Sequence, residues 1–201
     1  MRNIFEKEIE TCIESIPTVS NSERFIVGID GLSRSGKTTY TNLLHQKLIE
    51  YQMPILVFHM DDFIVERKKR YDTPFDEWYE YYQLQWDVDY LKKVFFSKLK
   101  TASQVVLPSY DPDNDDIVQK KMKLPTPCII LIEGVFLQRK EWHKYFDFFI
   151  FITSSKDKRF QREHADTKKK IDKFKTRYWI AESYYLENRN PEKHANLVIH
   201  N

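Results

Sequence analysis

Gly31-Leu32-Ser33-Arg34-Ser35-Gly36-Lys37-Thr38 is the stretch of this sequence that decides the fold. It matches the pattern G-x-x-x-x-G-K-[ST] in full. Only four glycines occur in 201 residues, and three of them, Gly28, Gly31 and Gly36, lie within nine positions. A chain so poor in glycine is expected to place it where the backbone needs unusual dihedral angles or approaches a ligand closely. The stretch therefore predicts a loop that wraps a phosphate chain.

The segments on both sides give this loop the context it requires. Residues 25–30 form a short apolar run typical of a buried parallel strand, and residues 38–50 have helical spacing without Gly or Pro. Strand, loop and helix in this order leave backbone N–H groups at a helix N-terminus, where they bind anions. Lys37 would reach the β- and γ-phosphates, and the Thr38 hydroxyl would bind Mg²⁺. The expected phosphate-binding residues are Gly31, Ser33, Arg34, Ser35, Gly36, Lys37, Thr38 and Thr39.

Composition narrows the class of protein. A net charge of +2 indicates no strong polyelectrolyte partner, so we expect no nucleic-acid binding. The N-terminus is charged throughout without a signal-peptide core, and no apolar run approaches the ~18 residues of a membrane span. Cys12 and Cys128 have no metal or redox spacing and fit reduced thiols. We therefore expect a cytoplasmic protein without a membrane partner.

The order of the remaining segments predicts one α/β domain over residues 1–201. Helices are expected within the N-terminal segment 1–20 (2–16), over 74–99 as one or two helices, in a basic region at 156–171 and at 176–187. Strands are expected at 55–60, 128–133, 146–152 and 196–199, with a short one at 104–108. This alternation favours three layers, α/β/α, around a mainly parallel five-stranded sheet. Ligands then bind at the carboxyl ends of the strands.

Acidic residues stand at two of those strand ends. Phosphoryl transfer to an alcohol needs a carboxylate that accepts the hydroxyl proton and orients the oxygen. Asp61 is the candidate base and a candidate magnesium ligand, with Asp62 as the alternative base or as a partner of the acceptor. Glu133 follows an apolar run and would bind Mg²⁺ directly or through water. His59 would point near the site if Asp61 does, but we favour a packed strand histidine.

Three segments together resemble a known family: 28–39, His59-Met60-Asp61-Asp62-Phe63, and Ile132-Glu133-Gly134-Val135-Phe136. They are similar to the uridine kinase-like group of P-loop kinases, which also includes nicotinamide riboside kinase, phosphoribulokinase and one type of pantothenate kinase. The resemblance covers residues 24–201. It implies the P-loop NTPase fold and transfer of the γ-phosphoryl group of ATP, with Mg²⁺, to a hydroxyl of a small metabolite. It also implies that Asp61 is the base, that Glu133 binds magnesium, and that Tyr110 and Asp111 contact the acceptor.

A lid is expected at about 153–178. Arg159 and Arg162 are three residues apart and share a helix face, where two guanidiniums suit the charge of a transferring phosphoryl group. The resemblance implies the same Arg-rich lid. The basic run 67–70 could bind an anionic acceptor or could be a solvated surface.

The sequence departs from uridine kinases proper after the Tyr-Asp pair. Those enzymes carry a histidine and an arginine there, whereas residues 110–116 are acidic and have neither. This argues against uridine and cytidine and favours a cationic or polyhydroxylated acceptor. Pantothenate, a sugar phosphate and nicotinamide riboside are the alternative acceptors. A nucleotide-dependent switch without an acceptor is the alternative from another class, and the sequence leaves a homo-oligomer open.

Overall fold

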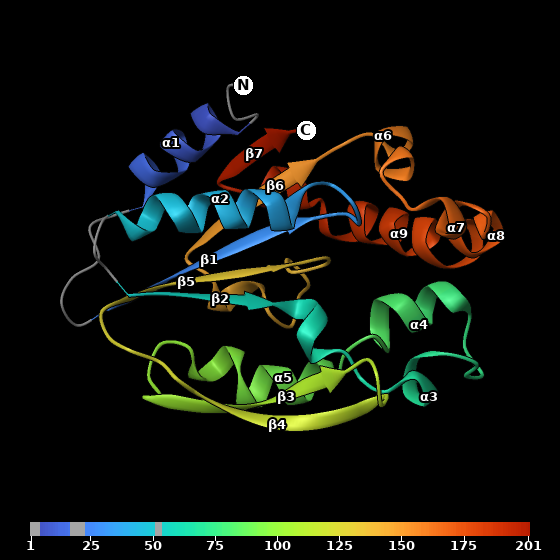
Figure 1. The fold of residues 1–201 in the computed structure, drawn as a ribbon, viewed down its shortest axis with the longest axis horizontal. Coiled ribbons are helices and arrows are strands. Elements are labelled where there is room, and N and C mark those ends of the chain that lie inside the picture. Colours follow the sequence, from blue (N-terminus) through green and yellow to red (C-terminus); the bar gives the residue numbers. More distant parts are fainter. Residues whose placement is uncertain (1–4, 17–22, 51–53) are drawn as a thin grey trace.

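The computed structural model describes residues 5–16, 23–50 and 54–201. Its centre is a five-stranded, fully parallel sheet in the order β2-β5-β1-β6-β7 (Figure 1). The strands are β1 Arg24–Gly31, β2 Ile55–His59, β5 Cys128–Gly134, β6 Phe148–Thr153 and β7 Leu197–His200. The five strands expected from the sequence are therefore confirmed, as is the parallel sheet.

Side chains from both faces of the sheet are buried, which explains the continuous apolar runs. On one face, Val27 and Ile29 pack against α1 (Glu6–Ser15) and α2 (Lys37–Ile49). On the other, Ile26 belongs to a larger aromatic core that includes residues of α5 (Val88–Val94) and α9 (Trp179–Arg189). The result is the expected three-layer arrangement (Figure 1). Helix α1 fits the prediction over 2–16, although residues 1–4 and 17–20 lie outside the described part.

The phosphate loop needs its glycines for two different reasons. Gly36 has φ +103° where the chain enters α2, a conformation that L side chains rarely adopt. At Gly31 the φ is +154°, and an added Cβ would lie 2.5 Å from the carbonyl oxygen of Ile152. Gly36 therefore permits the turn, and Gly31 permits close packing of the loop on β6.

A second, two-stranded sheet was only partly foreseen. Strand β3 (Gln104–Asp111) pairs in antiparallel register with β4 (Asp116–Lys123), so the expected short strand at 104–108 is longer and has a partner. The prediction missed β4 because most of its side chains are exposed, so its sequence shows no regular alternation of apolar and polar residues. The acidic segment between the strands is the turn of this hairpin, with Asp115 at φ +52°.

The helices at the carboxyl side of the sheet are shorter than expected. The region 74–99 contains α4 (Glu77–Gln83), α5 and a 3₁₀ turn, Phe96–Lys98, in agreement with two helices. The basic region expected at 156–171 is helical, as predicted, but it does not form one continuous helix. It is divided into α6 (Lys156–Gln161), α7 (Ala165–Lys168) and α8 (Ile171–Lys173), and a π-helical turn, Phe174–Tyr178, leads into α9. The remaining short helices are α3 (Arg67–Arg70), α10 (Pro191–His194) and 3₁₀ turns at Met60–Phe63 and His143–Tyr145.

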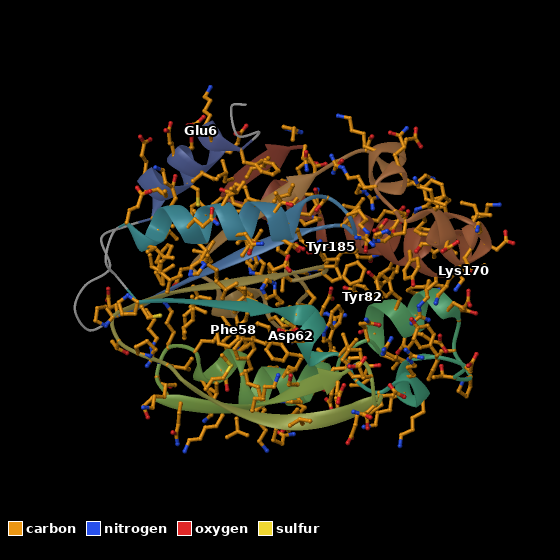
Figure 2. All side chains as sticks on the ribbon, in the orientation of Figure 1. Glu6, Phe58, Asp62, Tyr82, Lys170 and Tyr185 are labelled. Carbon is orange, nitrogen blue, oxygen red and sulfur yellow. The ribbon has the colours of Figure 1, made fainter. Side chains whose placement is uncertain are left out.

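Aromatic side chains join α9 to the body of the protein. The ring centroid of Tyr82 on α4 lies 5.0 Å from the ring centroid of Tyr184 and 6.3 Å from that of Tyr185, both on α9 (Figure 2). Tyr185 is buried and donates its hydroxyl hydrogen to Asp30 at the end of β1. Within residues 5–16, 23–50 and 54–201, no helix is long and apolar enough to cross a membrane.

Candidate active site

A cavity of about 720 Å³ lies at the carboxyl ends of the strands. Its lining comes from the phosphate loop, the segment after β2, the end of β5 and the helices that follow β6. Those helices, α6 to α9, lie beyond the strand ends (Figure 1). The sequence argument required the loop lysine and the carboxylate after β2 to face one space, and Lys37 and Asp61 both line it.

Lys37 lies at the base of this cavity. Its side chain is buried, and Nζ donates a hydrogen bond to the carbonyl of Leu32 at 3.0 Å. Burial lowers the pKa of Lys37, whereas the charges of Glu133, Asp61, Asp30 and Glu182 oppose this change. A lysine held inside its own loop among carboxylates is positioned to meet a polyanion that displaces the solvent.

Asp61 stands on the 3₁₀ turn that follows β2, Met60–Phe63. Its side chain is accessible from the cavity, yet the surrounding protein desolvates it and raises its pKa, while the charge of Lys37 lowers it. Asp62, the alternative base, is exposed and is not among the residues that line the cavity. The geometry therefore favours Asp61 as the carboxylate that meets an acceptor.

Thr38 and Glu133 come together as a pair of oxygen donors. The Thr38 hydroxyl lies 3.2 and 3.3 Å from the two carboxylate oxygens of Glu133. No cluster of three or more His, Cys, Asp or Glu side chains suited to a metal occurs in the described part of the chain. This donor set still fits Mg²⁺, because that ion prefers oxygen ligands and keeps waters and substrate phosphates in its shell. Asp61 lines the same cavity and is the third expected ligand.

His59 is a site residue that the sequence argument placed wrongly. Its Nδ1 lies 2.8 Å from Oε1 of Glu133, and this hydrogen bond raises the pKa of His59. The expectation of a merely packed strand histidine is therefore wrong. The sequence did offer a signal, since β2 ends at His59 and Asp61 follows two residues later. The imidazole fixes the orientation of the carboxylate expected to bind the metal.

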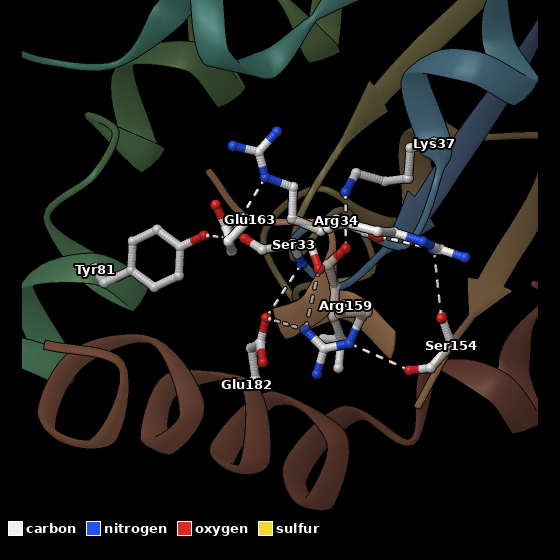
Figure 3. Close-up of polar contacts among 10 residues, drawn as sticks. Ser33, Arg34, Lys37, Tyr81, Ser154, Arg159, Glu163 and Glu182 are labelled. Atoms are coloured by element: carbon white, nitrogen blue, oxygen red, sulfur yellow. Dashed lines mark hydrogen bonds and ion pairs between the residues drawn. The ribbon is translucent and has the colours of Figure 1, made fainter. Parts of the chain in front are cut away.

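The lid contacts the phosphate loop through a buried ion pair. Arg159 on α6 and Glu182 on α9 are joined at 2.9 Å, with side chains 8% and 5% exposed. Glu182 accepts the backbone N–H of Ser33 at 3.1 Å, and Arg159 donates to the carbonyl of Ser33 at 3.1 Å (Figure 3). Burial raises the pKa of Glu182, against the opposing effect of Arg159. Two lid helices therefore meet the loop at one residue.

The second lid arginine also contacts the loop, but from a more exposed position. Arg162 donates to the carbonyl of Arg34 at 3.0 Å and to the side-chain oxygen of Asn201 at 3.2 Å. Arg34 in turn forms an ion pair with Glu163 at 3.1 Å. The structure therefore brings both predicted lid arginines to the loop, and both line the cavity with Ser33, Gly36, Thr38 and Thr39. Gly31 and Ser35 are buried beneath the loop.

The predicted acceptor contacts lie elsewhere. Tyr110 donates to Asp115 at 2.9 Å and accepts from Arg70 at 3.3 Å, so it ties the hairpin to α3. Asp111 is at the hairpin turn, where it accepts hydrogen bonds from Asp113 and Asn114. Neither residue is among those that line the cavity. Contact of Tyr110 and Asp111 with an acceptor stays a prediction, and so does contact of Asp62.

A different set of residues surrounds Asp61. We call Asp61, Ile64, Tyr81 and Gln85 the acceptor wall of the cavity, and the loop residues with Arg159, Arg162 and Glu182 its phosphate wall. The hydroxyls of Tyr81 and Ser33 lie 3.0 Å apart, so the two walls meet there (Figure 3). Sequence reasoning missed Glu182 and Gln85. Glu182 could have been found as an acidic residue on the buried face of a helix rich in aromatic residues. Nothing in the local sequence marks Gln85.

Comparisons with known proteins show the family of the chain and its fold. The model of the phosphoribulokinase/uridine kinase family matches residues 26–182. A solved structure described as a possible uridine kinase from Bacillus stearothermophilus has a TM-score of 0.83 and 45% identity, covering 98% of each chain. The uridine kinase of Staphylococcus haemolyticus is 27% identical over 150 residues, 72% of this chain and 70% of that protein. D-glycerate 3-kinase from Cryptococcus neoformans, at 14% identity and a TM-score of 0.57 over 91% of this chain and 85% of its own, shares the fold.

Proposed function

Because the chain belongs to the phosphoribulokinase/uridine kinase family, we propose that it is a Mg·ATP-dependent kinase that phosphorylates a hydroxyl group of a small metabolite. The observation that carries this proposal is the common cavity of Lys37 and Asp61. A nucleotide switch needs the lysine, its loop and one carboxylate for Mg²⁺, a role that Glu133 can fill, but it has no use for a second carboxylate on the turn after β2. The acceptor-dependent kinase is therefore favoured over the switch.

The chemistry divides between the two walls. Lys37 and the loop N–H groups would bind the β- and γ-phosphates, and Thr38, Glu133 and Asp61 would hold Mg²⁺, which neutralises charge on the phosphates. Asp61 would accept the proton of the acceptor hydroxyl as its oxygen attacks the γ-phosphorus.

The lid arginines complete the proposed mechanism. Arg159 and Arg162 would stabilise the negative charge that spreads over the transferred group. Both already contact the loop, so only small movements are needed to bring them to a bound phosphate. Closure of these helices would also exclude water, which otherwise competes with the acceptor.

The test is ADP formation by the purified chain with Mg·ATP, with and without acceptors from a panel of nucleosides, vitamins and sugars. We expect one acceptor class to stimulate ADP formation. Asp61→Asn should lower the acceptor-dependent rate by about 10²–10⁴-fold, because general base catalysis contributes that much, while ATP affinity is retained. Asp62→Asn is the matched control and should stay within a few-fold of wild type. Turnover that no acceptor stimulates, and that survives Asp61→Asn, would establish the switch instead.

A further inference from the structure

Gln85 carries a polar group that the described part of the protein leaves without a partner. The residue is 9% exposed and lines the cavity. Its side-chain oxygen is buried and accepts no hydrogen bond from the described residues. An unsatisfied buried amide costs about 1–3 kcal/mol, so proteins seldom keep one without a use. A ligand that enters the cavity can supply the missing bond.

The backbone around Gln85 is held rigidly beside the proposed base. The carbonyl of Gln85 accepts from the N–H of Val65 at 3.1 Å, and the indole of Trp86 donates to the carbonyl of Met60 at 2.8 Å. These two bonds bracket the segment that bears Asp61. Because they come from adjacent residues, they hold the backbone at Gln85 beside the turn that bears Asp61. The side chain of Gln85 therefore starts from a fixed position next to the proposed base.

The charges of the cavity are divided unevenly between its walls. The cations that line it are Arg34, Lys37, Arg159 and Arg162, and all four belong to the loop or the lid. On the acceptor wall, the charged residue is Asp61. Lys37 is the cation whose charge acts on Asp61, and the proposed triphosphate would engage it. An anionic acceptor would then add a negative charge beside this carboxylate, at a cost of about 1–4 kcal/mol for charges 4 Å apart. The acceptor wall therefore disfavours an anionic acceptor.

We propose that Gln85 recognises the acceptor. Its side chain forms a hydrogen bond to an uncharged hydroxyl or amide group beside the hydroxyl that is phosphorylated. This proposal rests on the proposed kinase function and names its acceptor class: neutral, polyhydroxylated or amide-bearing molecules, in preference to carboxylates and sugar phosphates. An amide can donate and accept at once, so it recognises a group that does the same. Of the alternatives raised by the sequence, pantothenate and sugar phosphates are disfavoured.

The experiment uses the full chain, Mg·ATP and two sets of acceptors. The neutral set is uridine, cytidine and fructose, and the anionic set is pantothenate, D-glycerate and ribulose 5-phosphate. We expect the best acceptor, by kcat/KM, to be neutral. With it, Gln85→Leu should raise the KM of the acceptor about tenfold or more, the loss of one hydrogen bond, and leave the KM of ATP unchanged. Gln119→Leu, on the exposed face of the hairpin, is the matched control and should change neither.

Thermal unfolding separates recognition from a structural role. If Gln85 serves the ligand, Gln85→Leu removes an unsatisfied buried group and should keep or raise Tm in the absence of acceptor. A lowered Tm together with unchanged acceptor KM would overturn the proposal, because the amide would then have a partner within the fold. An anionic best acceptor would also overturn it while leaving the kinase function intact. If no acceptor stimulates ADP formation, the kinase function itself fails and this inference fails with it.

Discussion

The two walls of the cavity differ in how their polar groups are satisfied. On the phosphate wall, two cations are already ion-paired within the protein, Arg159 with Glu182 and Arg34 with Glu163. The other two, Lys37 and Arg162, donate to backbone carbonyls. On the acceptor wall, Gln85 keeps an amide oxygen without a partner among the described residues, and Asp61 faces the cavity. The first wall is stable by itself and must exchange partners when a nucleotide binds. The second is completed by its ligand.

This difference has a consequence for stability and for affinity. A wall whose charges are paired contributes to folding before any ligand arrives, and its ligand must replace bonds that already exist. A wall with an unsatisfied amide costs folding free energy, and its ligand gains the full hydrogen bond. Mutations of the ion-paired residues on the phosphate wall should therefore affect both folding and nucleotide binding. Substitution of Gln85 on the acceptor wall should affect acceptor recognition without a loss of stability.

The largest of the effects on folding is expected for Glu182→Ala. The substitution leaves the guanidinium of Arg159 buried without its carboxylate and removes the acceptor of the Ser33 N–H. Breaking a buried ion pair from one side costs about 3–5 kcal/mol, so we expect a loss of unfolding free energy of about 3 kcal/mol. Chemical denaturation measures this, with Glu187→Ala, exposed on the same helix, as a control that should stay within about 0.5 kcal/mol.

The same variant tests whether the pairing on the phosphate wall is exchangeable. If the triphosphate takes over Arg159, saturating Mg·ATP should raise the Tm of Glu182→Ala by more than it raises that of wild type. The bound nucleotide then supplies the anion that the variant lacks. Equal increases in Tm would mean that Arg159 does not reach the nucleotide and that the phosphate wall does not exchange this ion pair when the nucleotide binds.

The sequence predicted the phosphate wall far better than the acceptor wall, and the reason is physical. A loop that wraps phosphate with its backbone needs Gly31, Gly36 and Lys37 at fixed spacing, so the chemistry is visible as a contiguous pattern. The parallel sheet followed from apolar runs buried on both faces. The carboxylates Asp61 and Glu133 could be placed because parallel strands end at one edge of the sheet.

The features that escaped prediction depend on tertiary contacts. Gln85 reaches the cavity because the chain after α4 is bonded to the turn that follows β2, and no local pattern encodes that pairing. The helix that carries Glu182 was predicted from its aromatic residues, and the partner of Glu182, Arg159, is 23 positions away in the sequence. The break between α6 and α7 was missed because a basic run has helical propensity whether or not tertiary packing divides it.

A smaller effect, on catalysis, is expected for Arg162→Ala. Its guanidinium bonds to the carbonyl of Arg34 from an exposed position, so its loss should not unfold the protein. We expect kcat to fall about tenfold, because a charge-assisted hydrogen bond to the transferred phosphoryl group is worth about 1.5–3 kcal/mol and solvent weakens it here. Lys158→Ala, exposed on α6, which Arg162 directly follows, is the control for a general change in lid charge. Equal losses in both variants would indicate a solvated basic surface and not a specific contact.

The smallest effect is the pH dependence of stability that arises from Glu182. Burial raises the pKa of Glu182 in the folded protein, so the fold binds a proton that the unfolded chain has already released. The free energy of unfolding should therefore fall as pH rises from the ordinary glutamate pKa to the raised one, by at most about 1.4 kcal/mol per pH unit. Glu182→Gln keeps hydrogen-bonding groups but cannot ionise, so the difference between wild type and variant isolates this contribution. Denaturant titrations of both proteins should show wild type losing stability relative to the variant as pH rises through that window. A difference that grows in the opposite direction would mean that Arg159 outweighs desolvation and that the phosphate wall holds its carboxylate as a favourable charge.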